Sequence, residues 1–298
     1  MNYGLPFQGS KNRIAKRIVE LLPSAETLYD LFAGGCAITH AALLSGKWKR
    51  VVCNDITDIP RLFVDAVNGK YADEERWISR ETFEKFKNTD PYIRLIWSFG
   101  GNQKDYIYSR EIEPYKRLMH EVCFAGTPYA RKLMLIPLVR YLLKVSPAGR
   151  TDSQNPEGLE RLQSIERYVH LENLERLQNV KNASALGARN LVQLQSDYRD
   201  VEISQSDSVI YCDIPYAGTK GYLTKFDHDV FYRWALSQTV PVFISEYWMP
   251  DDFECVAEFE RKSTFSSTSN NLLKVERIYR PKKQLFEERA IKKANHEL

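Results

Sequence analysis

Apolar and polar residues in the first part of the chain are ordered in a way that predicts two strands, each followed by a helix. Residues 28–32 run apolar like a buried strand, a glycine turn follows at residues 33–35, and helical character resumes over residues 37–44. Residues 51–55 repeat the strand pattern and end in an acid, and residues 59–67 read as the next helix. This order predicts an α/β fold with a parallel sheet.

The pattern changes in the middle of the chain, where long helical stretches rich in Arg, Lys and Tyr are broken at residues 99–102 and 146–149. Strand-like runs return at residues 190–194, 208–212, 240–245 and 275–279. The sheet is therefore expected to be interrupted and later completed. The expected parts are a discontinuous sheet domain of residues 1–68 and 186–281, a helical insertion of residues 69–185, and a charged C-terminal tail of residues 282–298.

Composition narrows the class of protein. The 298 residues are 43% hydrophobic, which allows a sizeable core and excludes a disordered chain. The five cysteines contain no C-x-x-C pair, so neither a metal site nor a disulfide framework is expected. We see no secretory leader pattern and no apolar run near the roughly 20 residues of a membrane span, and we expect a cytoplasmic protein without membrane contact. The net charge of +3 is compatible with a polyanionic partner but too small to argue for one.

The strongest chemical signal is the segment Tyr-Cys-Asp-Ile-Pro-Tyr at residues 211–216. An apolar strand here delivers Asp213, Pro215 and Tyr216 to the carboxyl end of a sheet, where open α/β folds bind ligands. By itself, an acid and a proline that end a strand at a turn would be the commoner explanation. The segment nevertheless resembles the D-P-P-Y signature of amino-methyltransferases, with Ile214 at the second position. Taken with the motifs below, the chain resembles the Dam-like (D12 class) adenine-N6 DNA methyltransferases.

The resemblance implies a fold and a reaction. The fold would be a Rossmann-like S-adenosylmethionine-dependent methyltransferase sheet with an inserted helical target-recognition domain. The chain would transfer a methyl group from S-adenosyl-L-methionine, giving S-adenosyl-L-homocysteine, to N6 of a flipped adenine in double-stranded DNA. The Asp213 carboxylate and the Ile214 carbonyl would accept hydrogen bonds from the amino group, and Pro215 would hold Ile214 extended. Tyr216 would stack on the flipped base.

A second motif precedes the first predicted helix. Residues 30–37, Asp-Leu-Phe-Ala-Gly-Gly-Cys-Ala, are similar to the family's acid-x-Phe-x-Gly-x-Gly cofactor loop, in which glycines let the ligand approach the backbone. Cys36 stands where the second glycine is expected. A glycine turn of any strand-helix unit is the alternative interpretation. The resemblance assigns cofactor binding to Asp30, Phe32, Gly34 and Gly35.

Shorter matches complete the cofactor site that the resemblance implies. Asp55 closes the second strand, where an acid typically accepts hydrogen bonds from ribose hydroxyls. Phe7 and Lys11 carry over from an N-terminal motif that closes over the methionine part of the cofactor. Asp197 and Tyr198 resemble the acid-aromatic pair that lines the adenine end.

The insertion would recognise DNA. Its basic residues are interleaved with tyrosines, a combination that suits phosphate and base-edge contacts, although charge on solvated helix faces is the simpler explanation residue by residue. The loop at residues 100–110 is the preferred place for base reading or intercalation. The expected DNA contacts are Asn102, Lys104, Tyr106, Arg110, Lys116 and Arg117.

Other readings stay open. One is an amino-methyltransferase that acts on another substrate, such as cytosine N4 or RNA, although an acid at position 213 favours DNA adenine. Another is a catalytically impaired DNA-binding relative, because folds outlive functions. Cytosine C5 chemistry would require a Pro-Cys nucleophile, which the chain lacks. A cognate restriction enzyme is a further partner that the resemblance allows, and a monomer on DNA is expected.

Overall fold

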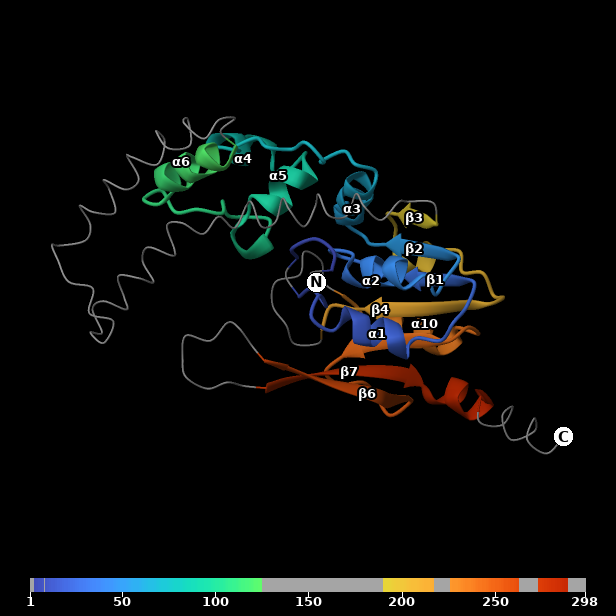
Figure 1. The fold of residues 1–298 in the computed structure, drawn as a ribbon. Coiled ribbons are helices and arrows are strands. Elements are labelled where there is room, and N and C mark those ends of the chain that lie inside the picture. Colours follow the sequence, from blue (N-terminus) through green and yellow to red (C-terminus); the bar gives the residue numbers. More distant parts are fainter. Residues whose placement is uncertain (1–2, 8, 125–189, 217–225, 263–272, 289–298) are drawn as a thin grey trace, which may run out of the picture. The chain divides into compact units, whose positions relative to one another are not determined.

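The structure, a computed structural model, describes residues 3–7, 9–124, 190–216, 226–262 and 273–288 (Figure 1). The chain divides into two compact units. Unit 1 comprises Met1–Gly4, Ser10–Asn68 and Leu186–Leu298, and unit 2 comprises Leu5–Gly9 and Gly69–Ala185. The expectations for residues 125–189, a large part of the predicted insertion, and for residues 289–298 of the predicted tail lie outside the described residues.

The described part of unit 1 is built on a seven-stranded sheet with the order β3-β2-β1-β4-β5-β7-β6 (Figure 1). Neighbouring strands from β3 to β5 are parallel, whereas β7 is antiparallel to both β5 and β6. The chain order reverses between β1 and β4, and ligands bind at the carboxyl ends of strands beside such a switch point. The strands are β1 (Thr27–Asp30), β2 (Arg50–Asn54), β3 (Leu191–Leu194), β4 (Ser208–Asp213), β5 (Val242–Glu246), β6 (Phe253–Lys262) and β7 (Leu273–Pro281).

Helices cover both faces of this sheet. Successive strand residues point to opposite sides, and since successive residues of β1, β2 and β4 are buried, each face needs a covering layer. Leu28 packs in a cluster with α1 (Ala15–Leu21) and α2 (Ala37–Ser45). The next residue, Tyr29, packs in a second cluster with α10 (His228–Ser237). A parallel sheet buried on both faces reads as continuous apolar runs, which explains the sequence pattern of β1, β2 and β4. The further elements of unit 1 are α3 (Ile59–Val67) and η3 (Tyr198–Asp200).

The observed strands lie where the apolar runs predict them, except β6, which the pattern did not reveal. Glu254, Glu258 and Glu260 place charges along β6, as is common in an edge strand with a solvated face. After β7, residues 282–288 of the predicted tail form a helix. The Gln284 side chain in this helix is buried, and its amide accepts a hydrogen bond from Val242 N at 3.0 Å and donates to Val240 O at 2.8 Å. This segment is therefore docked on β5.

The described part of unit 2 contains α4 (Arg80–Phe86), α5 (Pro91–Ile96), η1 (Phe99–Gly101) and α6 (Glu113–Phe124), joined by turns and irregular segments. Its interior is aromatic: Tyr92, Trp97 and Tyr106 are all buried. None of the helices in the described ranges has the length and apolar character needed to cross a membrane.

Candidate active site

The carboxyl end of β4 presents a carboxylate to a buried lysine. Asp213 is the last residue of β4, and its Oδ1 accepts a hydrogen bond from Lys11 Nζ at 2.6 Å. Lys11 comes from the segment before α1 and is only 4% exposed. Burial alone would lower the pKa of Lys11, but the carboxylates of Asp213 and Glu276 raise it above its ordinary value. The lysine is therefore a cation held inside the site.

A second carboxylate completes this cluster. Glu276 in β7 is buried, and its Oε1 lies 3.3 Å from Lys11 Nζ. The Lys11 ammonium also lies 4.7 Å from the ring centroid of Tyr216, and Tyr247 packs edge-on against the same ring with centroids 4.6 Å apart. Lys11, Asp213 and Tyr216, predicted from separate motifs, thus meet, whereas Glu276 and Tyr247 carried no sequence signal.

The turn after β4 is fixed by contacts on the α10 side. The Ile214 side chain is 1% exposed and packs in the apolar cluster that contains Phe231 of α10. The Pro215 carbonyl accepts a hydrogen bond from His228 Nε2 at 2.8 Å, at the first turn of α10. An isoleucine is accommodated here because its side chain points into the core. His228 is a third contributor that sequence reasoning missed, after Glu276 and Tyr247.

The loop after β1 is the predicted cofactor loop. Gly34 and Cys36 both adopt positive φ angles, +47° and +59°, and Cys36 directly precedes α2. The left-handed region costs a residue with a Cβ roughly 1–2 kcal/mol, which explains why glycine is expected at position 36. The Asp30 carboxylate is fully buried beneath the loop and accepts hydrogen bonds from Thr39 N at 3.1 Å and Thr39 Oγ1 at 2.6 Å. Burial raises the pKa of Asp30 to about 7.

The acid after β2 binds the same loop. Asp55 Oδ2 accepts a hydrogen bond from Gly34 N at 2.9 Å, and its Oδ1 accepts two from Thr57, at 2.9 and 2.8 Å. A carboxylate offers about four acceptor positions, so Asp55 keeps one for a further donor. Ile56, the next residue, is 59% exposed and places an apolar surface beside this acid. The predicted residues Gly34 and Asp55 are therefore in direct contact.

Asn54, which the sequence did not single out, ties the second strand to its neighbours. This fully buried side chain donates to Leu31 O at 3.2 Å and to Ser196 O at 3.1 Å, and it accepts from Ser196 N at 3.1 Å. It joins the loop after β1 to the loop after β3 through one amide. The three strand ends β1, β2 and β3 are held in fixed register by this contact.

The predicted acid-aromatic pair lies after β3. Asp197 caps η3, and its carboxylate is paired with Arg199 at 2.8 Å. The Tyr198 ring is buried and packs against Phe32 of the cofactor loop, with centroids 5.2 Å apart. Phe226 packs against both rings. Phe32 and Tyr198, predicted from separate motifs, are thus neighbours in one aromatic cluster.

The N-terminal segment rests on the cofactor loop. Gly4 N donates to His40 Nδ1 at 2.9 Å, and Gly4 has a φ of +68°. A Cβ at this position would press on the Gly35 carbonyl and lie 2.7 Å from Ala37 N. Burial lowers the pKa of His40 to about 4, so the ring is neutral and Nδ1 can accept. Only glycine allows this close approach; Phe7, also predicted here, belongs to unit 2.

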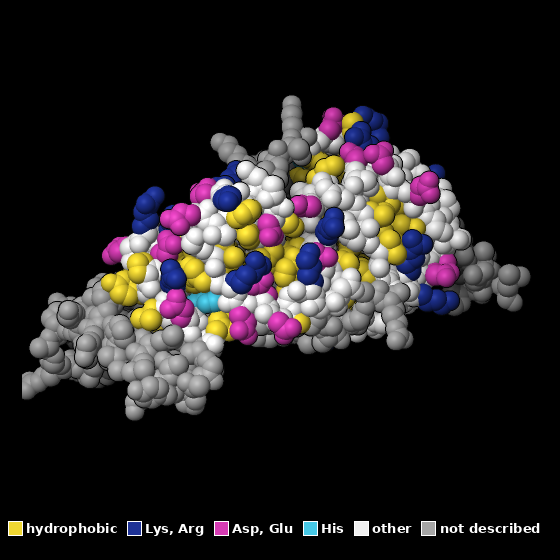
Figure 2. Space-filling view, turned by 90° about the horizontal axis from the view of Figure 1, so that it is seen from above, with side chains coloured by type: hydrophobic (Ala, Val, Ile, Leu, Met, Phe, Trp, Pro, Cys, Tyr) yellow, Lys and Arg dark blue, Asp and Glu magenta, His cyan; other side chains and the backbone are white. Residues whose placement is uncertain are grey.

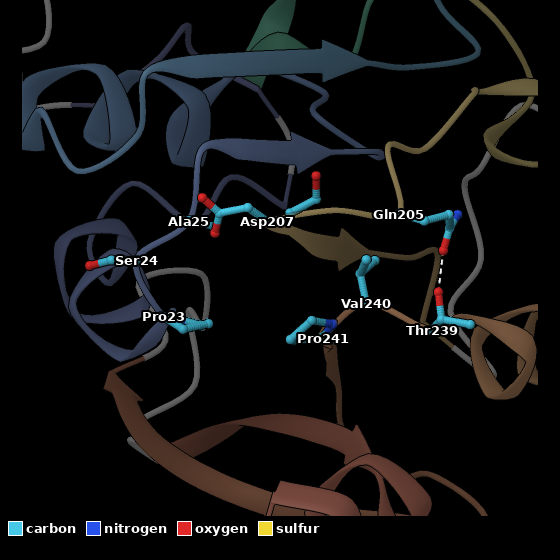
Figure 3. Close-up of a pocket in the computed structure, with 9 residues that line it drawn as sticks. Pro23, Ser24, Ala25, Gln205, Asp207, Thr239, Val240 and Pro241 are labelled. Carbon is cyan, nitrogen blue, oxygen red and sulfur yellow. Dashed lines mark hydrogen bonds between the residues drawn. The ribbon is translucent and has the colours of Figure 1, made fainter.

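One hollow in unit 1 lies elsewhere. Figure 3 shows a cavity lined by Pro23, Asp207, Thr239 and neighbouring residues, which precede β1, β4 and β5. It therefore opens at the amino ends of these strands, opposite the edge that carries Asp213.

The predicted DNA contacts in unit 2 divide into exposed and buried side chains. Lys104, Arg110 and Arg117 are exposed, the last in an ion pair with Glu121 at 2.9 Å. Tyr106 and Lys116 lie in the interior: the Tyr106 hydroxyl donates to a backbone carbonyl at 2.7 Å, and Lys116 is 4% exposed. These two are not surface groups because their polar ends face the protein.

The loop at residues 98–106 has a defined conformation. Asn102 Oδ1 accepts hydrogen bonds from Lys104 N at 2.9 Å and Asp105 N at 3.0 Å, and Phe99 N donates to Asp105 O at 2.7 Å. Gly100 sits in the left-handed region with a φ of +58°. Phe99, which the sequence did not single out, is 57% exposed at this loop. Asn102 therefore builds the loop that presents Phe99 and Lys104.

Charge on the visible face is mixed. Figure 2 shows Lys and Arg side chains interspersed with Asp and Glu among the described residues, with apolar patches between them. This distribution agrees with the small net charge of +3. Attraction of a polyanion would therefore depend on the position of individual basic side chains more than on the overall electrostatic potential of the protein.

One comparison with known proteins finds a matching family. The family model for D12 class N6 adenine-specific DNA methyltransferases matches residues 7–234, well over half of the chain and including every motif described above from Phe7 to Tyr216. A search of curated proteins gives no match.

Proposed function

The chain belongs to the D12 class N6 adenine-specific DNA methyltransferases, and from this premise we propose that it transfers a methyl group from S-adenosyl-L-methionine to N6 of an adenine flipped out of double-stranded DNA. The observation that carries the proposal is the cluster at the carboxyl end of β4. There Asp213, the buried Lys11 and the Tyr216 ring meet beside the switch point of the sheet.

The charge of the site suits a cationic cofactor. Asp30, Asp55, Asp213 and Glu276 contribute carboxyl groups that interact electrostatically in this region, against the ammonium of Lys11. S-Adenosylmethionine carries a sulfonium and an ammonium group, and when bound it supplies an electrophilic methyl group. An acidic edge favours such a ligand over an anionic one.

Individual side chains would hold the cofactor. The remaining acceptor position of Asp55 fits a ribose hydroxyl, and the exposed side chain of Ile56 offers an apolar surface to the adenine ring. The loop at Gly34 and Gly35, in which Gly34 has a positive φ of +47°, would let the backbone come close to the ligand. Phe32 and Tyr198 shape the neighbouring wall.

At the target end, the chemistry depends on hydrogen bonds to the amino group. The N6 lone pair of adenine is delocalised into the ring, and acceptors on both N–H groups let the nitrogen become pyramidal. Asp213 and the Ile214 carbonyl would supply these acceptors, on a turn that His228 fixes. Tyr216 would stack on the flipped base, and alignment of the two reactants supplies much of the acceleration.

DNA recognition would involve the loop at residues 98–106. Phe99 is an exposed aromatic side chain suited to stacking between bases, and Lys104 is an exposed cation suited to phosphate contact. We expect Phe99→Ala to weaken DNA binding with little change in its salt dependence. Lys104→Ala should instead reduce the slope of log K against log salt by about one unit. Both are measurable by fluorescence anisotropy with labelled duplex.

The reaction is tested with purified protein, S-adenosylmethionine and unmethylated genomic DNA, digested to nucleosides and examined for N6-methyladenine by mass spectrometry. Asp213→Ala should lose at least about 100-fold in rate, comparable to removal of a hydrogen bond made in the transition state. Asp251→Ala, an exposed carboxylate of the same unit, is the matched control and should keep full activity.

Cofactor binding measured by calorimetry separates the remaining outcomes. Binding without any methyladenine, with N4-methylcytosine or methylated RNA instead, would point to another amino substrate. If the wild-type protein neither binds S-adenosylmethionine nor transfers a methyl group, a non-catalytic DNA-binding relative is favoured and the proposal is overturned.

A further inference from the structure

Glu276 is a buried acid that the proposed reaction does not use directly. It lies in β7, 2% exposed, on the antiparallel side of the sheet. Desolvating a carboxylate costs several kcal/mol unless a partner offsets the loss. Because this cost arises next to the carboxyl end of β4, where the reaction is proposed to occur, we expect Glu276 to act on a group at that end.

The partner is Lys11. Its Nζ lies 2.6 Å from Asp213 Oδ1 and 3.3 Å from Glu276 Oε1, so one ammonium serves two carboxylates from different strands. An ammonium has three N–H donors and can bind both at once. With both acids ionised, the cluster of Lys11, Asp213 and Glu276 has a net charge of −1.

We infer that Glu276 is a positioning residue for the methyl transfer, acting on Asp213 through Lys11; the inference rests on the proposed function. When Glu276 shares the ammonium, Asp213 keeps negative charge and acceptor capacity for the target amino group. Without that carboxylate, Lys11 pairs with Asp213 alone and neutralises it. The nitrogen gains positive charge as it attacks, and a cluster of net charge −1 stabilises this change better than a neutral one.

The arrangement gives activity a dependence on pH. The titratable groups that face Glu276 are Lys11, Asp213 and Tyr211. Burial raises the pKa of Glu276, and Lys11 opposes the increase only in part. As the pH falls through this raised pKa, Glu276 takes up a proton and the cluster becomes neutral. The rate of transfer should therefore fall on the acid side at a higher pH than an ordinary glutamate would cause.

The test compares Glu276→Gln with the wild-type protein in kcat, in KM for DNA, in calorimetric affinity for S-adenosylmethionine and in the pH profile of kcat. We expect kcat to fall by about 10- to 100-fold, as for other groups that orient a functional side chain, and the acid-side contribution of Glu276 to disappear. KM should change little. Glu258→Gln, the same change at a 56% exposed side chain on the neighbouring strand β6, is the matched control.

Glu276→Asp separates charge from volume. If the charge positions Lys11, activity should rank Glu above Asp above Gln; if Glu276 only fills space, the isosteric Gln should exceed Asp. The inference is overturned if Gln keeps the wild-type kcat and pH profile, or if Asp falls below Gln. Should the Gln variant not fold, Glu276→Met takes its place in the same ranking. A wild-type protein without methyl transfer would refute the proposed function instead.

Discussion

Asp30→Asn is expected to stabilise unit 1 at neutral and alkaline pH. The buried Asp30 carboxyl has a pKa of about 7 in the folded chain, against 3.8 ordinarily, chiefly because burial disfavours its charged form. The unfolded chain therefore ionises first as the pH rises. Below about pH 4 the group is protonated in both states and costs nothing. Between about pH 4 and 7 stability is lost at about 1.4 kcal/mol per pH unit, and above pH 7 the loss is constant at about 4 kcal/mol.

An asparagine removes this titration while keeping the contacts. Both hydrogen bonds from Thr39 go to one oxygen of Asp30, Oδ2, which the amide oxygen of Asn can replace. Any destabilisation caused by the NH₂ group of Asn is independent of pH. A change with pH in the stability difference between variant and wild type therefore reports the titration of Asp30 alone. With about 2 °C per kcal/mol for a chain of this size, the melting temperature of the variant relative to wild type should rise by about 6–8 °C between pH 4 and pH 8.

Differential scanning calorimetry at several pH values measures this difference, and titrations elsewhere cancel in the comparison. Asp251→Asn, at an exposed position, should show a constant difference. If the difference in melting temperature between Asp30→Asn and wild type were also independent of pH, the argument that burial raises the pKa of Asp30 would be refuted. If Asp30 also binds the cofactor, the stabilised variant should bind it more weakly in calorimetric titrations.

Two further substitutions test the cofactor loop. Cys36→Gly should be more stable than Cys36→Ala by about 1 kcal/mol in chemical denaturation, the reverse of the usual order, because only Gly relieves the left-handed conformation; a more stable Ala variant would contradict this geometry. Gly4→Ala should destabilise by at least about 2 kcal/mol and weaken cofactor binding, because its Cβ collides with the loop backbone. Gly46→Ala, with a similar φ of +63° but open space around it, should cost less, and equal losses would show that φ alone matters.

Much of the fold could be predicted because the central parallel strands β1, β2, β4 and β5 are buried on both faces. Each of these strands is a short apolar run, and its place in the chain needs no knowledge of distant contacts. The β6 strand could not be recognised in this way, because Glu254, Glu258 and Glu260 give it the composition of a solvated segment. Its strand conformation comes from pairing with β7, which is a tertiary contact.

The same distinction separates the site residues. Asp213 ends an apolar strand and Asp55 directly follows one, so their place at the carboxyl edge follows from the local pattern. Glu276 and His228 act through partners more than ten residues away in sequence, and no spacing reveals such pairs. Tyr106 was expected to contact DNA because tyrosines here are interleaved with basic residues, but its large apolar ring is buried and its hydroxyl donates to a backbone carbonyl.

The two departures from the family pattern, Ile214 and Cys36, share a physical property. At both positions the proposed chemistry uses the backbone: the carbonyl of Ile214 as an acceptor, and the turn at Cys36 as the entry to α2. The Ile214 side chain is buried in the core. Cys36 adopts the left-handed conformation that a glycine would adopt without strain. A substitution that preserves the backbone geometry at such a position costs stability of roughly 1 kcal/mol and leaves the acceptor in place. A change at Asp213 would instead remove the proposed acceptor itself, so we expect activity to tolerate substitution at positions 36 and 214 but not at position 213.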